Sequence, residues 1–156
     1  PVWIDPLHLR RILTNLISNA IKYVYAGGEV QIHTWELHNA SELPGEPHEQ
    51  LQWENKDEHS LIIAIEDNGV GIRAEDQPNI FNRFFRSENP LSVEVGGTGL
   101  GLSITRSLIE VHKGQIGFHS VESEGSYFWI RLPISNIDAM IETEESPSDG
   151  VMYIES

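Results

Sequence analysis

The sequence predicts an α+β protein in which helices cover one face of a mixed β-sheet. Two helical patterns, each followed by a pair of strand patterns, carry this prediction. The 156 residues suffice for one domain with a proper core, and no internal repeat suggests another architecture. Hydrophobic residues make up 39% and charged residues 22%, as in ordinary globular proteins.

The first helix is predicted to begin after Asp5, with this residue as N-cap and Pro6 at the first helical position. Gly27-Gly28 ends it. Apolar residues recur at helical spacing between these limits, at Leu9, Ile12, Leu13, Leu16, Ile17, Ala20, Ile21 and Val24.

Two strands should follow. Residues 29–37 alternate polar and apolar side chains, as a half-buried strand does, and residues 61–66 form a compact apolar run typical of a buried strand. The segment 38–59 between them contains Pro44 and Pro47 and scattered acids, so we expect a long loop or insertion.

The second half should begin with a short helix at residues 74–85 and an irregular stretch at 88–99. Residues 100–113 are again helical, with Gly114 as the end signal. Two further strands are expected, joined by a turn at Glu124-Gly125; they comprise residues 115–121 and 127–132.

The net charge of −14 argues against a protein that binds nucleic acid through phosphate contacts. Two segments carry most of this acidity, so the rest of the chain is almost neutral. Residues 36–60, which include the expected insertion, hold seven acids and one base, Lys56. The segment 136–156 has no base and is expected to form a disordered tail; its six acids are Asp138, Glu142, Glu144, Glu145, Asp149 and Glu155.

No apolar run is long enough to cross a bilayer, and no signal peptide opens the sequence. We expect a cytoplasmic domain, either free or as the cytoplasmic part of a membrane-bound protein, without direct membrane contact of its own. The first residue is Pro1, which suggests a fragment of a longer protein. The absence of cysteine excludes disulfides and thiolate metal sites.

The first helix carries polar residues beside its apolar stripe. Asn15, Asn19 and Lys22 fall within roughly 60° of one another around a helix of 3.6 residues per turn. An asparagine oxygen is a neutral hard ligand that suits Mg²⁺, and an ammonium group can bind phosphate. The alternative is that the asparagines only satisfy nearby loop backbone.

A second polar segment, Asp67-Asn68-Gly69-Val70-Gly71, follows the buried strand. Glycines let the backbone approach a flat ligand closely, and an ionised aspartate is an acceptor that matches the amino group of adenine. The alternative is a simple tight turn.

A glycine-rich segment, Gly96-Gly97-Thr98-Gly99-Leu100-Gly101, runs into the second long helix. Converging backbone N–H groups at a helix N-terminus can hold phosphate. The segment is not a Walker A loop, because no Lys-Ser or Lys-Thr follows Gly101. The alternative is a glycine hinge without a ligand.

The segment 80–86 joins aromatic residues to two arginines. Phe81, Phe84 and Phe85 can pin a mobile segment to the body, and Arg83 and Arg86 offer guanidinium groups to phosphate. The alternative is that the aromatic residues belong to the core.

Together these segments resemble the catalytic ATP-binding domain of bacterial sensor histidine kinases, which has the Bergerat nucleotide-binding fold. Residues 15–23 are similar to the N box of that family, 67–72 to the G1 box, 80–86 to the F box and 97–104 to the G2 box. The resemblance covers residues 2–133 and implies a two-layer α/β sandwich with a mostly antiparallel sheet. It divides the chain into a domain at 1–135, with an ATP lid at 82–98, and the acidic tail.

The resemblance also implies roles for single residues. Asn19 would bind Mg²⁺, Lys22 a phosphate oxygen and Asp67 the adenine amino group, helped by a water near Gly71. Arg86 would be a lid cation near the γ-phosphate. The remaining residues expected to contact ATP are Asn15, Tyr23, Gly69, Ile72, Phe81, Thr98, Gly99, Leu100, Gly101 and Leu102.

Asn15 stands where ATP-hydrolysing relatives place the glutamate that activates water. An amide cannot act as a general base, so transfer to a nucleophile of another domain is favoured over hydrolysis. No histidine here matches the family's phosphoacceptor, which precedes an acid and a proline in a helical hairpin. The resemblance therefore implies a histidine kinase whose dimerisation domain and response regulator are partners, with this fragment monomeric and the full protein a homodimer.

Two other functions stay open at this point. One is a related serine kinase or ATPase of a switch complex, which would hydrolyse ATP or label serine without any hairpin. The other is a nucleotide-binding interaction module that has lost phosphoryl transfer.

Overall fold

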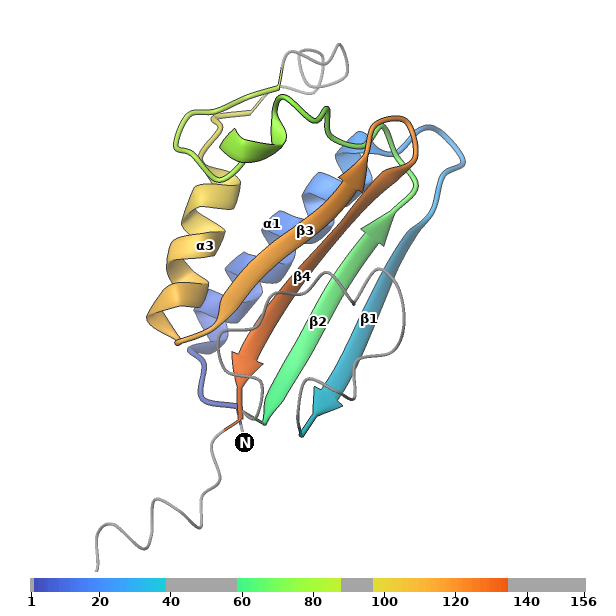
Figure 1. The fold of residues 1–156 in the computed structure, drawn as a ribbon. Coiled ribbons are helices and arrows are strands. Elements are labelled where there is room, and N and C mark those ends of the chain that lie inside the picture. The colour runs from blue at the N-terminus through green and yellow to red at the C-terminus, as the bar shows by residue number, and fades with distance from the viewer. Residues whose placement is uncertain (1, 39–58, 88–96, 135–156) are drawn as a thin grey trace, which may run out of the picture.

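The computed structural model describes residues 2–38, 59–87 and 97–134. Figure 1 shows one helical layer packed against one sheet. The elements, in chain order, are helix α1 (Pro6–Tyr23), strands β1 (Val30–Leu37) and β2 (Ser60–Asp67), the short 3₁₀ helix η3 (Gln77–Asn79), helix α3 (Gly101–Val111), and strands β3 (Gln115–Val121) and β4 (Gly125–Pro133).

Helix α1 begins as its sequence predicts. The side chain of Asp5 accepts a hydrogen bond from the backbone N–H of Leu7 at 2.7 Å, and Pro6 occupies the first helical position, where no N–H is needed. Ile12, Leu16 and Ala20 are the buried residues of the helix, at spacings of four. This spacing turns one stripe of the helix toward the sheet.

The four strands pair in the order β1-β2-β4-β3, and every neighbouring pair is antiparallel. The fold class is thereby confirmed, although the described strands include no parallel pair. An isolated antiparallel bridge joins Val2 to Ile134, so the end of β4 lies beside the start of the chain. Strands β2 and β4 are the interior strands, each hydrogen-bonded on both sides.

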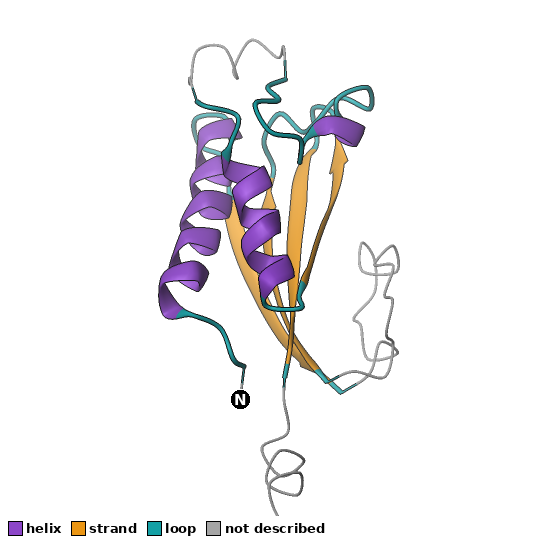
Figure 2. Ribbon diagram, turned by 90° about the vertical axis from the view of Figure 1, so that its left-hand side faces the viewer, coloured by secondary structure: helices purple, strands orange, loops and turns teal. Residues whose placement is uncertain are grey.

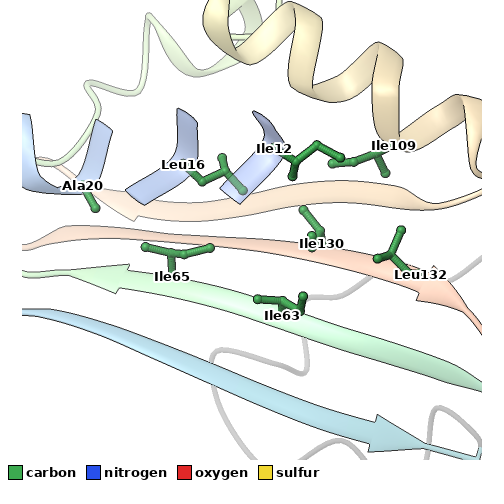
Figure 3. Close-up of a cluster of buried hydrophobic side chains, with 8 residues drawn as sticks. All are labelled: Ile12, Leu16, Ala20, Ile63, Ile65, Ile109, Ile130 and Leu132. Carbon is green, nitrogen blue, oxygen red and sulfur yellow. The ribbon is translucent and has the colours of Figure 1, made fainter. Parts of the chain in front are cut away.

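Both long helices lie on the same face of the sheet (Figure 2). The core lies between the two layers, and its side chains interdigitate in Figure 3. Alternate residues of β2 and β4 face the helices, because successive strand side chains point to opposite faces. The cluster consists of Ile12, Leu16, Ala20, Ile63, Ile65, Ile109, Ile130 and Leu132.

The predicted helix at residues 74–85 is wrong. The structure has only the three-residue η3 there, flanked by turns. Pro78 lacks a backbone N–H, and its ring disfavours helical geometry at the preceding residue, so it interrupts the segment. Asn79 and Asn82 bond to each other through their side chains at 3.0 Å, as asparagines do in turns. The expected insertion and tail, and most of the expected lid, lie outside the described residues.

Truncating Ile130 tests the core. Ile130 of β4 is fully buried in the core cluster. We expect Ile130→Ala to lower the free energy of unfolding by about 2–5 kcal/mol, through lost burial and the cavity left behind. Ile32→Ala on β1 is the control, because Ile32 is 54% exposed. Urea unfolding followed by circular dichroism measures both, and equal losses in the two variants would contradict this packing.

Candidate nucleotide-binding cleft

A cleft of about 250 Å³ opens between the helical layer and the loops at one end of the sheet. Its walls come from α1, the end of β2, the loops on either side of η3, the start of α3, and β4. The lining residues are Asn15, Asn19, Ala20, Lys22, Tyr23, Asp67, Val70, Gly71, Ile72, Ile80, Phe85, Arg86, Ser87, Gly97, Thr98, Gly99, Gly101, Leu102, Ser126 and Phe128.

Asp67 is the last residue of β2 and is only 7% exposed. Its Oδ1 accepts a hydrogen bond from the N–H of Gly69 at 2.9 Å, which closes the turn after the strand. Burial raises the pKa of the Asp67 carboxyl, and the nearby charge of Glu66 raises it further. The backbone hydrogen bonds from Gly69 and Ser126 act in the opposite direction. The cleft therefore contains a buried acceptor that keeps lone pairs for a ligand.

The raised pKa of Asp67 has a consequence for stability. A carboxyl whose pKa is higher in the folded state favours folding when protonated, below the pKa of the unfolded chain near 3.8. This contribution is lost as the pH rises through the folded-state pKa. At neutral pH the buried carboxylate therefore destabilises the nucleotide-free domain.

We accordingly expect Asp67→Asn to raise the Tm of the nucleotide-free protein at pH 7. The gain should shrink as the pH approaches 3, where wild-type Asp67 is itself neutral. Differential scanning calorimetry of both proteins across this range is the measurement. A Tm difference that does not change with pH would contradict the assigned burial effect.

The loop after β2 fits tightly against the β3–β4 turn. Gly71 has a φ of 64°, and a Cβ there would lie 2.0 Å from the carbonyl oxygen of Val121. Only glycine meets both conditions. Ile72 is held nearby, because its N–H donates to the Oγ of Ser120 at 2.9 Å. These contacts give the cleft floor a fixed backbone.

Asn19 and Lys22 extend from the last turns of α1 into the cleft. In the part of the chain that the structure describes, neither the Asn19 amide nor the Lys22 ammonium has a hydrogen bond or ion pair. An asparagine without a protein partner on a cleft wall is poised to bind something else. The alternative was that Asn19 satisfies loop backbone, and no such bond is found among the described residues.

Asn15 has a different environment. Its Nδ2 donates to the Oγ1 of the buried Thr105 at 2.9 Å and so joins α1 to α3. Its Oδ1 lies 2.3 Å from where a Cβ of Gly101 would be. Glycine at the start of α3 thus lets the two helices approach closely at the edge of the cleft.

The region before the undescribed residues 88–96 is anchored at two points. The N–H of Phe84 donates to the carbonyl of Gly99 at 2.9 Å, joining the two sides of that gap. Asp76 accepts hydrogen bonds from Arg73 Nε at 3.0 Å and from the hydroxyl of Ser87. The hydroxyl of Ser87 and the charge of Arg73 hold the pKa of Asp76 below its ordinary value despite its burial.

Twelve of the predicted site residues line this one cleft, although they come from four separate segments. They are Asn15, Asn19, Lys22, Tyr23, Asp67, Gly71, Ile72, Arg86, Thr98, Gly99, Gly101 and Leu102.

Three predicted site residues lie elsewhere. Gly69 supports Asp67 through its N–H. The ring of Phe81 packs edge-on against Phe118 at a centroid distance of 5.9 Å, as the core alternative has it. Leu100 is the N-cap of α3 and lines a neighbouring groove.

Several residues that line the cleft were not predicted from the sequence. Ser126 and Phe128 reach the cleft because β4 pairs with β2, a contact between distant parts of the chain. No local pattern in the sequence predicts such a contact. Val70, Ile80 and Phe85 lie within segments singled out for other residues, so their proximity to those residues was the available signal.

An antiparallel four-stranded sheet with two helices on one face is the fold of histidine kinase-type ATPase domains. Residues 4–136 match the family described as "Histidine kinase-, DNA gyrase B-, and HSP90-like ATPase". This match covers most of the chain, and the chain belongs to this family.

The curated relatives of the chain include sensor kinases. The chain is 39% identical over 142 residues to the sensor protein GacS of Pseudomonas syringae pv. syringae, covering 91% of this chain and 14% of GacS. It is 33% identical over 135 residues to the sensor protein kinase WalK of Staphylococcus haemolyticus, covering 86% of this chain and 19% of WalK. The chain thus spans a small part of each relative.

Solved structures agree with this assignment. The mycobacterial sensor histidine kinase MprB superposes with a TM-score of 0.61 at 26% identity, covering 83% of this chain and 72% of that one. The catalytic domain of histidine kinase ThkA in a nucleotide-free form also has a TM-score of 0.61 at 26% identity, over 85% of this chain and 71% of that one. None of the described helices has the combination of length and apolarity needed to cross a bilayer.

Proposed function

We propose that this domain binds Mg-ATP and transfers its γ-phosphoryl group to a histidine on a separate dimerisation domain, in two-component signalling. One observation carries the proposal. The buried acceptor Asp67 lines the same cleft as Asn19, whose amide has no partner among the described residues, and as Gly99 and Gly101 at the start of α3. Such a cleft supplies an acceptor for the base and separate groups for the metal and the phosphates.

Each group suits one part of the nucleotide. Asp67 accepts from the adenine amino group, and the backbone at Gly71, packed against the turn at Val121, lies beside the ring. Lys22 and the backbone N–H groups around Gly99 and Gly101 meet phosphate oxygens. Arg86 lies within the predicted lid and lines the cleft, where its guanidinium suits the γ-phosphate.

A magnesium ion bound together with ATP needs few ligands from the protein. Among the described residues there is no cluster of three or more His, Cys, Asp or Glu side chains that could hold an ion. Mg²⁺ commonly binds through one or two protein oxygens together with substrate phosphates and water, so one amide oxygen suffices. Asn19 fits this role because its side chain has no protein partner. When bound, Mg²⁺ neutralises charge on the phosphates.

Transfer to histidine is favoured over hydrolysis because no base is present at the position of Asn15. Its amide cannot accept a proton at neutral pH, and it already donates to Thr105. A histidine ring nitrogen of the dimerisation domain would attack the γ-phosphorus, while the bridging oxygen leaves with ADP. This domain contributes orientation and charge neutralisation at the phosphoryl group.

The other partners follow from this reaction. We propose a homodimeric full-length kinase whose phosphohistidine passes its phosphoryl group to an aspartate of a response regulator. The domain would act in the cytoplasm, where ATP is available. The sensor-kinase relatives support this setting.

The test is transfer of radiolabelled γ-phosphate from ATP to a separately added histidine-bearing hairpin. Labelled hairpin that loses its label when the histidine is replaced supports the proposal. Label on serine, or phosphate release without the hairpin, would favour a switch-complex kinase or ATPase. Nucleotide binding with no transfer to several hairpins would favour the interaction module.

A further inference from the structure

A second groove runs along the outer side of α1 and the start of α3, away from the sheet. It has a volume of about 580 Å³. Leu7, Arg11, Thr14 and Ser18 recur at spacings of three and four, so they form one stripe of α1. Leu100 and Ile104 of α3 line the opposite wall.

Two cations of this groove have no partner in the described part of the chain. Arg10 and Arg11 are exposed, and neither has an ion pair or hydrogen bond within residues 2–38, 59–87 and 97–134. The groove thus combines two uncompensated positive charges with the hydroxyls of Thr14 and Ser18 and an apolar end at Leu7, which is 71% exposed. This chemistry fits an acidic segment with some apolar side chains.

The chain itself contains such a segment. Residues 136–156 carry six acids and no base, interspersed with Ile137, Ile141 and Val151. This segment also starts close to the N-terminal end of α1, where the groove begins. Ile134 bridges to Val2, so the chain leaves β4 beside the residues that lead into α1 (Figure 1).

The segment that follows β4 is long enough to reach along the groove. The stripe from Leu7 to Ser18 is roughly 17 Å long at the helical rise of 1.5 Å per residue. A chain of 14 residues, the length from 135 to 148, can reach at most roughly 45–50 Å, which exceeds the length of the stripe. A tethered segment of this length stays at millimolar effective concentration, at which weak ionic contacts suffice for substantial occupancy.

We propose that the groove of Arg10 and Arg11 is a docking surface for the acidic segment 136–156 of the same chain. Its carboxylates pair with the two guanidinium groups, and its apolar residues cover Leu7 and Ile104. Asn15, Thr98 and Gly101 line both this groove and the nucleotide cleft. The docked segment therefore lies against the outer side of the cleft wall. This proposal does not depend on which acceptor receives the phosphoryl group.

A spin-label experiment on the full chain tests it. The protein has no cysteine, so Ser148→Cys gives a single attachment point for a nitroxide. We expect strong paramagnetic relaxation of the α1 amides near Arg10 and Thr14, with none at Ile32 on β1. Raising the ionic strength from about 0.01 M to about 1 M shortens the screening length from about 30 Å to about 3 Å and should abolish the effect.

Neutralising variants locate the contact. Arg10→Gln combined with Arg11→Gln should reduce the docked-to-free ratio roughly 2- to 25-fold, the product of two exposed ion pairs. Glu142→Gln, Glu144→Gln and Glu145→Gln together should have a similar effect. Arg106→Gln is the control, because Arg106 is an exposed cation of α3 outside the groove.

Relaxation that persists unchanged in the Arg10→Gln, Arg11→Gln protein would overturn the proposal. So would relaxation confined to the sheet, or none at low salt. Heteronuclear spectra of each variant verify that the fold is intact, so a lost contact is not mistaken for unfolding. Nucleotide titration of the same samples separates this result from the proposed function, because ATP binding requires neither arginine.

Discussion

Replacing Asp67 by asparagine is expected to weaken Mg-ATP binding by a factor of about 10 to 100, the typical contribution of a hydrogen bond to a charged group. The carboxylate is 7% exposed and lines the cleft, so its pairing with the base is protected from water. Asparagine keeps one oxygen that can accept from the Gly69 N–H. Its NH₂ group, however, would face the amino group of the base, donor against donor. Isothermal titration calorimetry measures the change.

Glu66→Gln is the matched control for this experiment. It removes the same charge one residue earlier on β2, but Glu66 points to the other face, where it bonds to His33 at 3.1 Å. Its affinity should stay close to that of the wild type. The higher Tm expected for Asp67→Asn without nucleotide provides a second check, since weak binding cannot then reflect unfolding. Unchanged ATP affinity in Asp67→Asn would remove the carboxylate from base recognition.

Asn19→Ala is expected to reduce phosphoryl transfer to an added histidine hairpin at least about 100-fold, as losses of a positioned metal or charge-stabilising group typically do. The side chain has no protein partner in the described structure, so its removal breaks no described contact. Alanine is also the best helix former, so α1 should remain intact. Initial rates of radiolabel transfer at saturating ATP give the measurement.

Two further variants identify the cause of such a loss. Asn19→Asp keeps an oxygen ligand and should retain measurable transfer that depends steeply on Mg²⁺ concentration. Ser107→Ala removes a polar side chain from the exposed side of α3 and should transfer at the wild-type rate. Transfer by Asn19→Ala at the wild-type rate would exclude this residue from the metal site.

Much of the fold was predictable because its signals are local. Asp5 and Pro6 mark the start of α1, and the spacing of Ile12, Leu16 and Ala20 predicts which side of it is buried. The short helix before Phe85 was predicted wrongly, since Pro78 and the asparagine turn outweigh the weak apolar pattern there.

Some residues of the candidate site were predictable from local signals in the sequence, and others were not. Asp67 and Asn19 could be selected from sequence because polar residues beside a buried strand or stripe are anomalous. Ser126 and Phe128 could not be selected, since they enter the cleft only through the pairing of β2 with β4. The bond between Asn15 and Thr105 likewise joins residues 90 positions apart. Such contacts depend on tertiary packing, which no short pattern encodes.

The position of Asp67 at the end of an interior strand has a consequence for the order of nucleotide release. Strand β2 is bonded along both edges, so its amides should be among the last to exchange with deuterium. Thr98 and Gly99 instead belong to a loop, where opening costs little free energy. If the nucleotide binds as proposed, the contacts to its phosphates should therefore break first and the contacts to its purine last. The group that distinguishes one base from another then lies at the end of the strand expected to open least often.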